Sequence, residues 1–266
     1  MMKVKDIIKE IELLAPKHLA AEWDNVGLMV GSNEATVNGV YVCLDVTSKN
    51  VEEAINAGCN LIVAHHPLIF NPIKSVTAED TLGSIIHALL ENNVSVYSAH
   101  TNFDICEGGL NDILADKIGV RNIRRFTEDE LKAEDGKTLE PYGVVGKLDA
   151  PVRFEEFAEQ VASALDAPCL KYVGDLNETV STVGMVCGGG GSHLYAAYRA
   201  GADVYVSSDF RHHEAQQAQE IGLNLIDAGH FETENLFCGF MQTFLGEKFE
   251  GLRVTLSTSK GYFDRI

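Results

Sequence analysis

The sequence of 266 residues lacks the features of several specialised protein classes. None of its six cysteines forms a C-x-x-C pair, and a chain of this length needs no disulfides to fold. No apolar run approaches the roughly 20 residues that a membrane-spanning helix requires. The segment 1–14 mixes Lys, Asp and Glu into its apolar positions, so we expect no signal peptide. Together these absences favour a soluble, cytoplasmic protein with reduced, buried thiols.

Basic residues are also scarce. There are 21 Lys and Arg against 39 Asp and Glu, which gives a formal net charge of −18. Such a field repels nucleic acids and anionic membrane surfaces, and only Arg121, Arg124 and Arg125 form a basic cluster. We therefore expect no nucleic-acid or membrane partner. An anionic substrate such as a nucleotide would need local positive charge, which bound cations could supply.

Apolar runs alternate with helical patterns along nearly the whole chain, and this alternation predicts an α/β fold with largely parallel sheets. The predicted strands cover 27–30, 40–46, 61–64, 94–98, 142–148, 180–187, 203–206 and 223–227. The predicted helices cover 4–14, 48–57, 79–91, 109–118, 153–165, 193–200, 212–221 and 232–246.

One acidic segment interrupts this alternation. Residues 127–141 hold six acids, two lysines and few apolar side chains, which is typical of a solvated linker. We therefore predict two α/β lobes. The first is a metal-binding lobe of residues 1–126 plus 228–266, and the second comprises residues 142–227.

Histidines and acids follow four of the predicted strands directly. In open parallel sheets, ligands bind at the carboxyl ends of the strands, so this placement predicts a functional site there. The residues concerned are His65 and His66, His100 and Asp104, Asp209 with His213, and His230 with Glu234.

Five of these residues form a candidate metal-ligand set, namely His65, His66, Asp104, His230 and Glu234. Three imidazoles and two carboxylates suit zinc, iron or manganese. One catalytic zinc normally takes three protein ligands, so five predict two divalent ions about 3.5–4 Å apart. Adjacent His65 and His66 diverge and can serve different ions. His230 and Glu234 share one face if a helix begins near residue 230. The predicted site lies at strand carboxyl ends near the lobe interface.

The remaining candidates keep alternative interpretations. His100, His213 and Asp209 could move protons, orient a metal-bound imidazole or be ordinary polar loop residues. The run Gly188–Gly191 could hold an anion through Gly189 and Gly190, or could simply form a tight turn. Trp23 and Asn25 could contact the base of a substrate, or Trp23 could anchor a loop to the core.

Several motifs together resemble the Nif-three-like family, whose bacterial members are often called GTP cyclohydrolase 1 type 2 homologs. The motifs are Trp23-Asp24-Asn25-Val26-Gly27-Leu28, His65-His66-Pro67-Leu68, His100-Thr101-Asn102-Phe103-Asp104, the glycine run, and Gly229-His230-Phe231 with Glu234. The resemblance implies a dinuclear metal centre between two α/β lobes, with the five ligands above and Glu234 as the bridge. It also implies a toroidal homohexamer. This chain has Ser207-Ser208-Asp209 where many relatives have Thr-Gly-Asp.

We therefore expect a metal-dependent hydrolase in which a dinuclear centre activates water. The resemblance implies that it opens the purine ring of GTP. Two alternatives remain at this point. The same centre suits a phosphoesterase acting on a nucleotide-type substrate, or the protein is a non-catalytic ring that binds metal or nucleotide and acts through protein partners.

Overall fold

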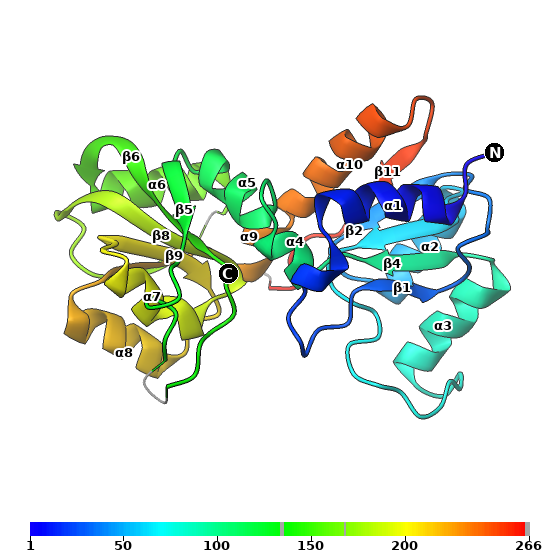
Figure 1. Ribbon diagram of the computed structural model, residues 1–266, viewed down its shortest axis with the longest axis horizontal. Coiled ribbons are helices and arrows are strands. Elements are labelled where there is room, and N and C mark those ends of the chain that lie inside the picture. Colours follow the sequence, from blue (N-terminus) through cyan, green and yellow to red (C-terminus); the bar gives the residue numbers. More distant parts are fainter. Residues whose placement is uncertain (134–135, 168, 264–266) are drawn as a thin grey trace. The chain divides into compact units, whose positions relative to one another are not determined.

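The computed structural model describes residues 1–133, 136–167 and 169–263 (Figure 1). The chain divides into two compact units, Met1–Cys106 with the residues from Phe237 onward, and Glu107–Leu236. Each unit contains one sheet with helices on both faces, so the predicted α/β class is confirmed. Among the described residues, no helix is both long and apolar enough to cross a membrane.

The sheet of the first unit has the strand order β1-β4-β3-β2-β11. Its strands are β1 (Gly27–Val30), β2 (Val40–Cys43), β3 (Leu61–Ala64), β4 (Ser95–Ser98) and β11 (Val254–Leu256). All neighbouring pairs are parallel except β1 with β4. β2, β3 and β4 are buried along their whole length, because helices cover both faces of the sheet.

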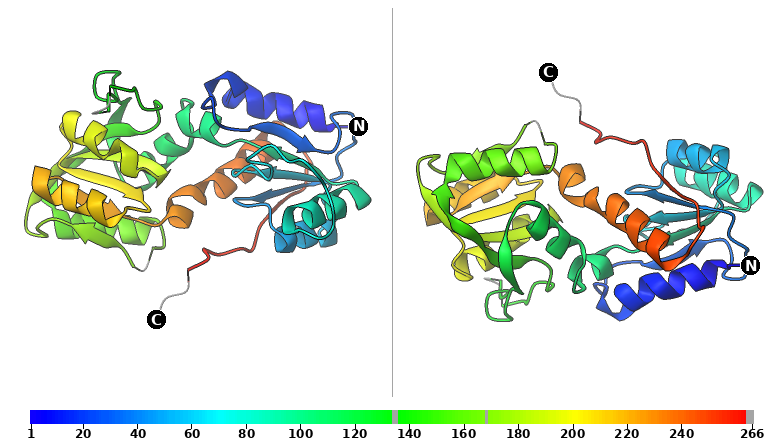
Figure 2. Two further views of the ribbon diagram at one scale, coloured as in Figure 1. Left: turned by 90° about the horizontal axis from the view of Figure 1, so that it is seen from below. Right: turned by 90° about the horizontal axis from the view of Figure 1, so that it is seen from above.

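The helices of this unit are α1 (Val4–Leu14), the 3-10 turn η1 (Lys17–Leu19), α2 (Ser48–Asn56), α3 (Thr81–Glu91), α4 (Thr101–Ile105) and α10 (Leu236–Lys248). α2 and α3 pack on one face, where their apolar residues join Tyr41, Ile62 and Val96 in one core. α1 and α10 cover the other face (Figure 2), and an ion pair of 3.3 Å between Glu10 and Lys248 joins them.

The sheet of the second unit has the order β5-β6-β8-β9-β10-β7. Its strands are β5 (Arg121–Arg125), β6 (Val144–Arg153), β7 (Lys171–Val173), β8 (Thr179–Gly189), β9 (Val204–Ser208) and β10 (Asn224–Asp227). Only β8, β9 and β10 run parallel to one another. β5, β6 and β7 pair antiparallel with their neighbours, so this sheet is mixed and not largely parallel as predicted.

α5 (Leu110–Lys117) and α6 (Phe154–Ala164) cover one face of this mixed sheet (Figure 1). The 3-10 turn η2 (Gly191–His193), α7 (Leu194–Arg199) and α8 (His212–Ile221) lie on the other face. There Leu194, Ala197 and Ala218 join Tyr205 and Leu225 in a second core. α9 (His230–Glu234) follows β10 and contacts β8 and β9.

The prediction missed β5, β7, β11 and the short helix α4. β5 is the basic cluster itself, and its charged side chains carry no apolar alternation that would predict a strand. The other missed elements have at most five residues and lack the continuous apolar run that predicts a four-residue strand such as β3. The helix predicted at 232–246 is two helices, since α9 begins at His230 and Asn235 separates it from α10.

The boundaries of the two compact units also differ from those of the predicted lobes. β5 pairs with β6 and α9 contacts β8, so residues 107–126 and 228–236 group with the second unit. The described part of the acidic segment also belongs there. Leu131 is buried in the core of that unit, and the Arg199 guanidinium donates to the Glu130 and Lys132 carbonyls. Residues 134 and 135 of the predicted linker lie outside the described residues.

This packing yields a first testable outcome. Leu131 is 3% exposed, so Leu131→Ala leaves a cavity and should lower the free energy of unfolding of the second unit by about 2–5 kcal/mol. Urea denaturation followed by circular dichroism measures the loss. The control Leu90→Ala removes a side chain that is 55% exposed and should cost less than about 0.5 kcal/mol. Equal, small effects of both changes would mean that the segment is a solvated linker.

Candidate metal centre

Three parallel strands of the first unit end together and bring the candidate residues to one edge of the sheet. Cys43 pairs with Ala64, and Ala64 pairs with Ser98. The ladder continues one step further, because the His66 amide donates to the Leu44 carbonyl at 2.9 Å and the Ala99 amide donates to the Ala64 carbonyl at 3.0 Å. The residues that follow the strands therefore lie next to one another at the carboxyl edge, as expected for parallel strands.

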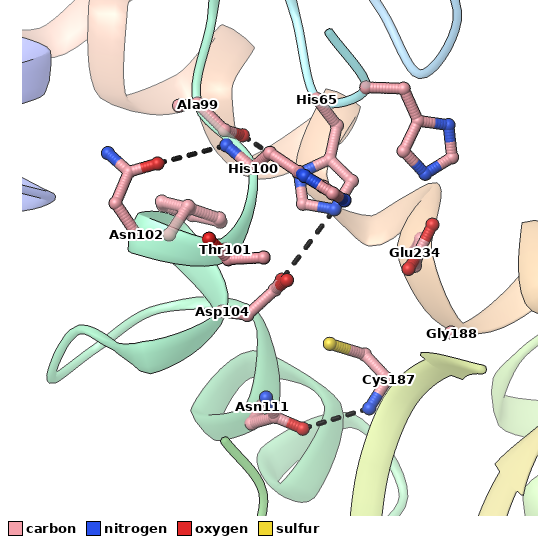
Figure 3. A network of polar contacts seen from close by, with 12 residues as sticks. His65, Ala99, His100, Thr101, Asn102, Asp104, Asn111, Cys187, Gly188 and Glu234 are labelled. Atoms are coloured by element: carbon pink, nitrogen blue, oxygen red, sulfur yellow. Dashed lines mark hydrogen bonds and ion pairs between the residues drawn. The ribbon is translucent and has the colours of Figure 1, made fainter. Parts of the chain in front are cut away.

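His65 is fully buried with its ring orientation fixed. Its Nδ1 lies 2.9 Å from the Ala99 carbonyl oxygen, which can only accept, so Nδ1 carries the hydrogen. The other nitrogen, Nε2, faces Asp104 Oδ1 at 3.6 Å (Figure 3). Asp104 comes from α4 and is 8% exposed. This buried pair offers an imidazole nitrogen and a carboxylate oxygen, the donors that zinc, iron and manganese accept.

A carboxylate holds the imidazole ring of His66 through Nδ1. Its Nδ1 donates to Asp45 Oδ1 at 2.7 Å, which directs Nε2 away from Asp45. A carboxylate bound to the second ring nitrogen is the usual partner of a metal-ligating histidine, because it fixes the tautomer and raises the basicity of the ligand atom. Sequence reasoning did not single out Asp45, because the predicted strand 40–46 includes it, whereas the observed strand β2 ends at Cys43.

His100 completes a histidine cluster in this unit. One ligand atom each from His65, His66 and His100 lies within 4.8 Å of the others, so this group could hold a metal ion. His100 Nδ1 lies 2.9 Å from Asp24 Oδ1, and Asp24 Oδ2 accepts from the Thr101 amide and hydroxyl. Burial alone would raise the pKa of Asp24, but the hydrogen bonds from His100 and Thr101 hold it at about 2. Asp24 is thus ionised and accepts the Nδ1 hydrogen of His100.

The second unit repeats this arrangement at the ends of β9 and β10. Ser207 pairs with Asp227, so Asp209 and His230 follow neighbouring parallel strands. His230 Nδ1 lies 2.7 Å from Asp209 Oδ2, and His230 Nε2 lies 2.9 Å from Glu234 Oε2. Because α9 begins at His230, the side chains of His230 and Glu234 share one face of this helix.

The charge on His230 follows from these two neighbours. Burial would lower the pKa of His230, but Glu234 and Asp209 together raise it to about 9. In the metal-free chain the ring therefore carries a proton on both nitrogens at neutral pH. Glu234 is 4% exposed, and this cationic ring offsets the cost of burying its carboxylate.

The backbone around Asp209 explains how the chain tolerates Ser208. Asp209 itself has the left-handed φ of 57°, a conformation that Asp adopts more readily than most residues. Ser208 does not have a positive φ, so the serine that stands where many relatives have glycine needs no special backbone freedom.

The glycine run lets carboxylates approach the backbone closely. Gly188 has a φ of +63°, and a Cβ there would lie 2.0 Å from Glu234 Oε1 and 3.3 Å from His230 Nε2. A Cβ on Gly191 would lie 2.5 Å from the Glu214 carboxylate. A Cβ on Gly190 would lie 2.3 Å from Ser207 Oγ, so three of these four glycines are required by packing. An anion contact at Gly189 and Gly190 stays a prediction.

The other candidates lie further from these clusters or at the surface. His213 is in the first turn of α8, with its Nε2 4.0 Å from Glu214 Oε1 and its side chain 56% exposed. Trp23 is 52% exposed, and its ring centroid lies 5.8 Å from that of Phe70 and 6.2 Å from that of His100. Asn25 Nδ2 donates to the Ile69 carbonyl at 2.5 Å, which holds the loop that carries Phe70.

Residues 2–261 match the family described as Duf34/NIF3 (NGG1p interacting factor 3). The chain belongs to this family. It is 36% identical over 233 residues to a GTP cyclohydrolase 1 type 2 homolog of Clostridium perfringens, covering 88% of this chain and 87% of the relative.

Solved structures of family members agree with this assignment. A Bacillus cereus protein related to NIF3 superposes with a TM-score of 0.87 at 26% identity, covering 100% of this chain and 99% of that one. Reduced HcgD from Methanocaldococcus jannaschii superposes with a TM-score of 0.82 at 31% identity, covering 96% and 97%. The α/β fold thus agrees with the family over essentially the whole length.

The close approach of Gly188 to Glu234 and His230 generates a prediction. Gly188→Ala adds a Cβ that displaces these two side chains, and we expect at least a tenfold loss of Zn²⁺ affinity, about the size seen when a partner of a ligand is removed. Titration against a chromophoric chelator measures the affinity. The matched control is Gly189→Ala, whose Cβ would lie 3.7 Å from Asp209 Oδ2 in ordinary contact, and its affinity should be unchanged. If Gly188→Ala binds Zn²⁺ as well as the control, the pair His230 and Glu234 holds no metal.

Proposed function

We propose that this chain is a metal-dependent hydrolase with a dinuclear centre held by His65, His66, Asp104, His230 and Glu234. The observation that carries the proposal is the orientation of the histidines. His65 and His66 each donate Nδ1–H to an oxygen acceptor, which leaves Nε2 to serve as the ligand atom. His65, His66 and Asp104 belong to the first unit and His230 and Glu234 to the second, and the resemblance implies that Glu234 would be shared by both ions.

The residues fit divalent ions chemically. Imidazole nitrogens and carboxylate oxygens without a thiolate suit zinc, iron or manganese at a catalytic site. Asp104 and Glu234 are 8% and 4% exposed, and positive charge beside a buried carboxylate offsets the cost of its burial, as the protonated His230 ring does for Glu234. Divalent ions would add positive charge beside both carboxylates. A chain with a net charge of −18 also gains from cations when its substrate is an anion.

The proposed reaction is hydrolytic opening of the imidazole ring of GTP. Bound divalent ions lower the pKa of water towards neutrality and so supply the nucleophile. Two waters add across the two C–N bonds of the ring carbon, which leaves as formate. The proposed proton carrier is His100, because Asp24 holds its Nδ1–H and Nε2 would accept and return the protons. Assembly into a homohexamer, implied by the resemblance stated above, is part of the proposal.

The substrate base is proposed to stack on Trp23. This ring is half exposed, lies beside Phe70 and stands edge-on to His100, so a base on it would lie next to the proposed proton carrier. Asn25 fixes the neighbouring loop through the Ile69 carbonyl. Backbone N–H groups of Gly189 and Gly190 are the proposed contacts to the phosphates.

Trp23 is the only tryptophan of the chain, so its fluorescence reports this contact directly. We expect GTP to quench the emission, whereas ribose 5-phosphate, which lacks a base, leaves it unchanged. Stacking contributes about 1–3 kcal/mol per base, so Trp23→Ala should raise KM for GTP by about 5- to 150-fold. Tyr172→Ala, which removes another half-exposed aromatic ring, should leave KM unchanged. Equal quenching by both compounds would exclude base stacking.

The proposed enzymatic activity is tested with the protein reconstituted separately with zinc, iron, manganese and magnesium. Elemental analysis should give about two ions per subunit, and GTP should be turned over with release of formate. Glu234→Gln should abolish turnover and lower metal affinity by about 10- to 100-fold. The control is Glu232→Gln, which lies two residues earlier on α9 and so points to another side of the helix.

Each other outcome of this experiment contradicts a stated part of the proposal. Hydrolysis of phosphoesters but not of the guanine ring would replace the cyclohydrolase by a phosphoesterase. Metal and nucleotide binding without any turnover would make the chain a non-catalytic binding protein. A chain that takes up no metal would overturn the dinuclear centre altogether.

A further inference from the structure

The residues that follow β11 return to the carboxyl edge of the first sheet. β11 runs parallel to β2, with Leu256 paired to Val42, and the Ser257 amide donates to the Val42 carbonyl at 2.9 Å. Because the two strands are parallel, the chain leaves β11 at the edge where Asp45 follows β2. We call residues 257–262 the C-terminal strap; it belongs to the red part of the chain in Figure 2.

Side chains fasten the C-terminal strap to α2. The Ser257 and Ser259 hydroxyls donate to Asn50 Oδ1 at 3.0 and 2.8 Å, and the Thr258 hydroxyl donates to Glu53 Oε1 at 2.7 Å. Asn50 is 1% exposed, and its amide nitrogen donates to the Asp45 carbonyl at 2.6 Å. One buried side chain thus joins the strap to the loop that carries Asp45.

The end of the strap contacts the Asp45 carboxylate itself. The Tyr262 hydroxyl donates to Asp45 Oδ2 at 3.2 Å, while His66 Nδ1 donates to Asp45 Oδ1 at 2.7 Å. The two oxygens of one carboxylate are therefore held by two different groups. A carboxylate fixed at both oxygens cannot rotate without losing a hydrogen bond. The Tyr262 contact therefore restricts the orientation of the Asp45 carboxylate, and through it the orientation of the His66 ring.

We infer that Tyr262 is a positioning residue of the metal centre, acting through Asp45 on the imidazole of His66. The inference rests on the metal binding of His66 in the proposed function and not on GTP hydrolysis. Tyr262 does not touch the metal or the substrate in this scheme. Its hydroxyl and the anchors on α2 fix the direction in which His66 Nε2 points.

The test measures the affinity of the full chain for Co²⁺ and Zn²⁺ by competition with a chelator. Asp45→Asn removes the direct partner of His66 and should weaken binding by about 10- to 100-fold. Tyr262→Phe removes one hydrogen bond and should weaken binding by about two- to tenfold. The visible absorption bands of bound Co²⁺ should shift in Tyr262→Phe, because the ligand field depends on the direction of the His66 ring. Phe263→Leu, whose ring is 93% exposed, is the matched control and should change neither quantity.

The double variant decides whether Tyr262 acts through Asp45. In the Asp45→Asn background, Tyr262→Phe should cause no further loss of affinity. An additive loss, or wild-type affinity and spectrum in Tyr262→Phe alone, would overturn the inference and leave the proposed hydrolase intact. If the wild-type protein bound neither Co²⁺ nor Zn²⁺, both the inference about Tyr262 and the proposed hydrolase would be overturned. Metal binding without GTP turnover would contradict only the proposed reaction, since affinity and spectrum still test Tyr262.

Discussion

Both groups of candidate ligands depend on one interaction, a hydrogen bond between a carboxylate and an imidazole. It forms in each unit at the carboxyl ends of parallel strands. In the first unit Asp45 follows β2 and holds His66 after β3. In the second unit Asp209 follows β9 and holds His230 after β10. The two pairs are similar because adjacent parallel strands in register deliver consecutive loops to the same edge. In each pair the carboxylate engages Nδ1, so that Nε2 is the atom proposed to bind metal; in His230 this atom lies 2.9 Å from Glu234 Oε2.

The rest of each unit keeps these loops in place. In the first unit, fully buried strands end directly before His65 and Ala99, and the Ala99 carbonyl fixes the ring of His65. In the second unit, Gly188 leaves room for the Glu234 carboxylate beside the backbone of β8. A side chain at Gly188 would occupy the position of Glu234. Gly188 is therefore explained by a buried acid that must approach the backbone closely.

Family membership agrees with the residues that the motifs single out. His65, His66, His230 and Glu234 stand in short sequences that are specific in combination, and their strand-end placement was predictable from the apolar runs before them. The acids that orient the histidines were harder to find. Asp24 resembles an ordinary loop residue and Asp45 lies inside a predicted strand. Only the pairing of β1 with β4 and of β2 with β3 brings them to the rings.

The sequence by itself determined the α/β class, the buried apolar strands, the longer helices, and the histidines and acids at the strand ends. These are local properties, since periodicity and residue type act over a few neighbours. Only the tertiary structure decided the mixed pairing of the second sheet, the place of Leu131 in its core and the partner of each imidazole. Strand order and register depend on contacts between residues far apart in the chain. Tyr262 and Asp45 are separated by more than two hundred residues, yet parallel pairing of β11 with β2 places them in contact.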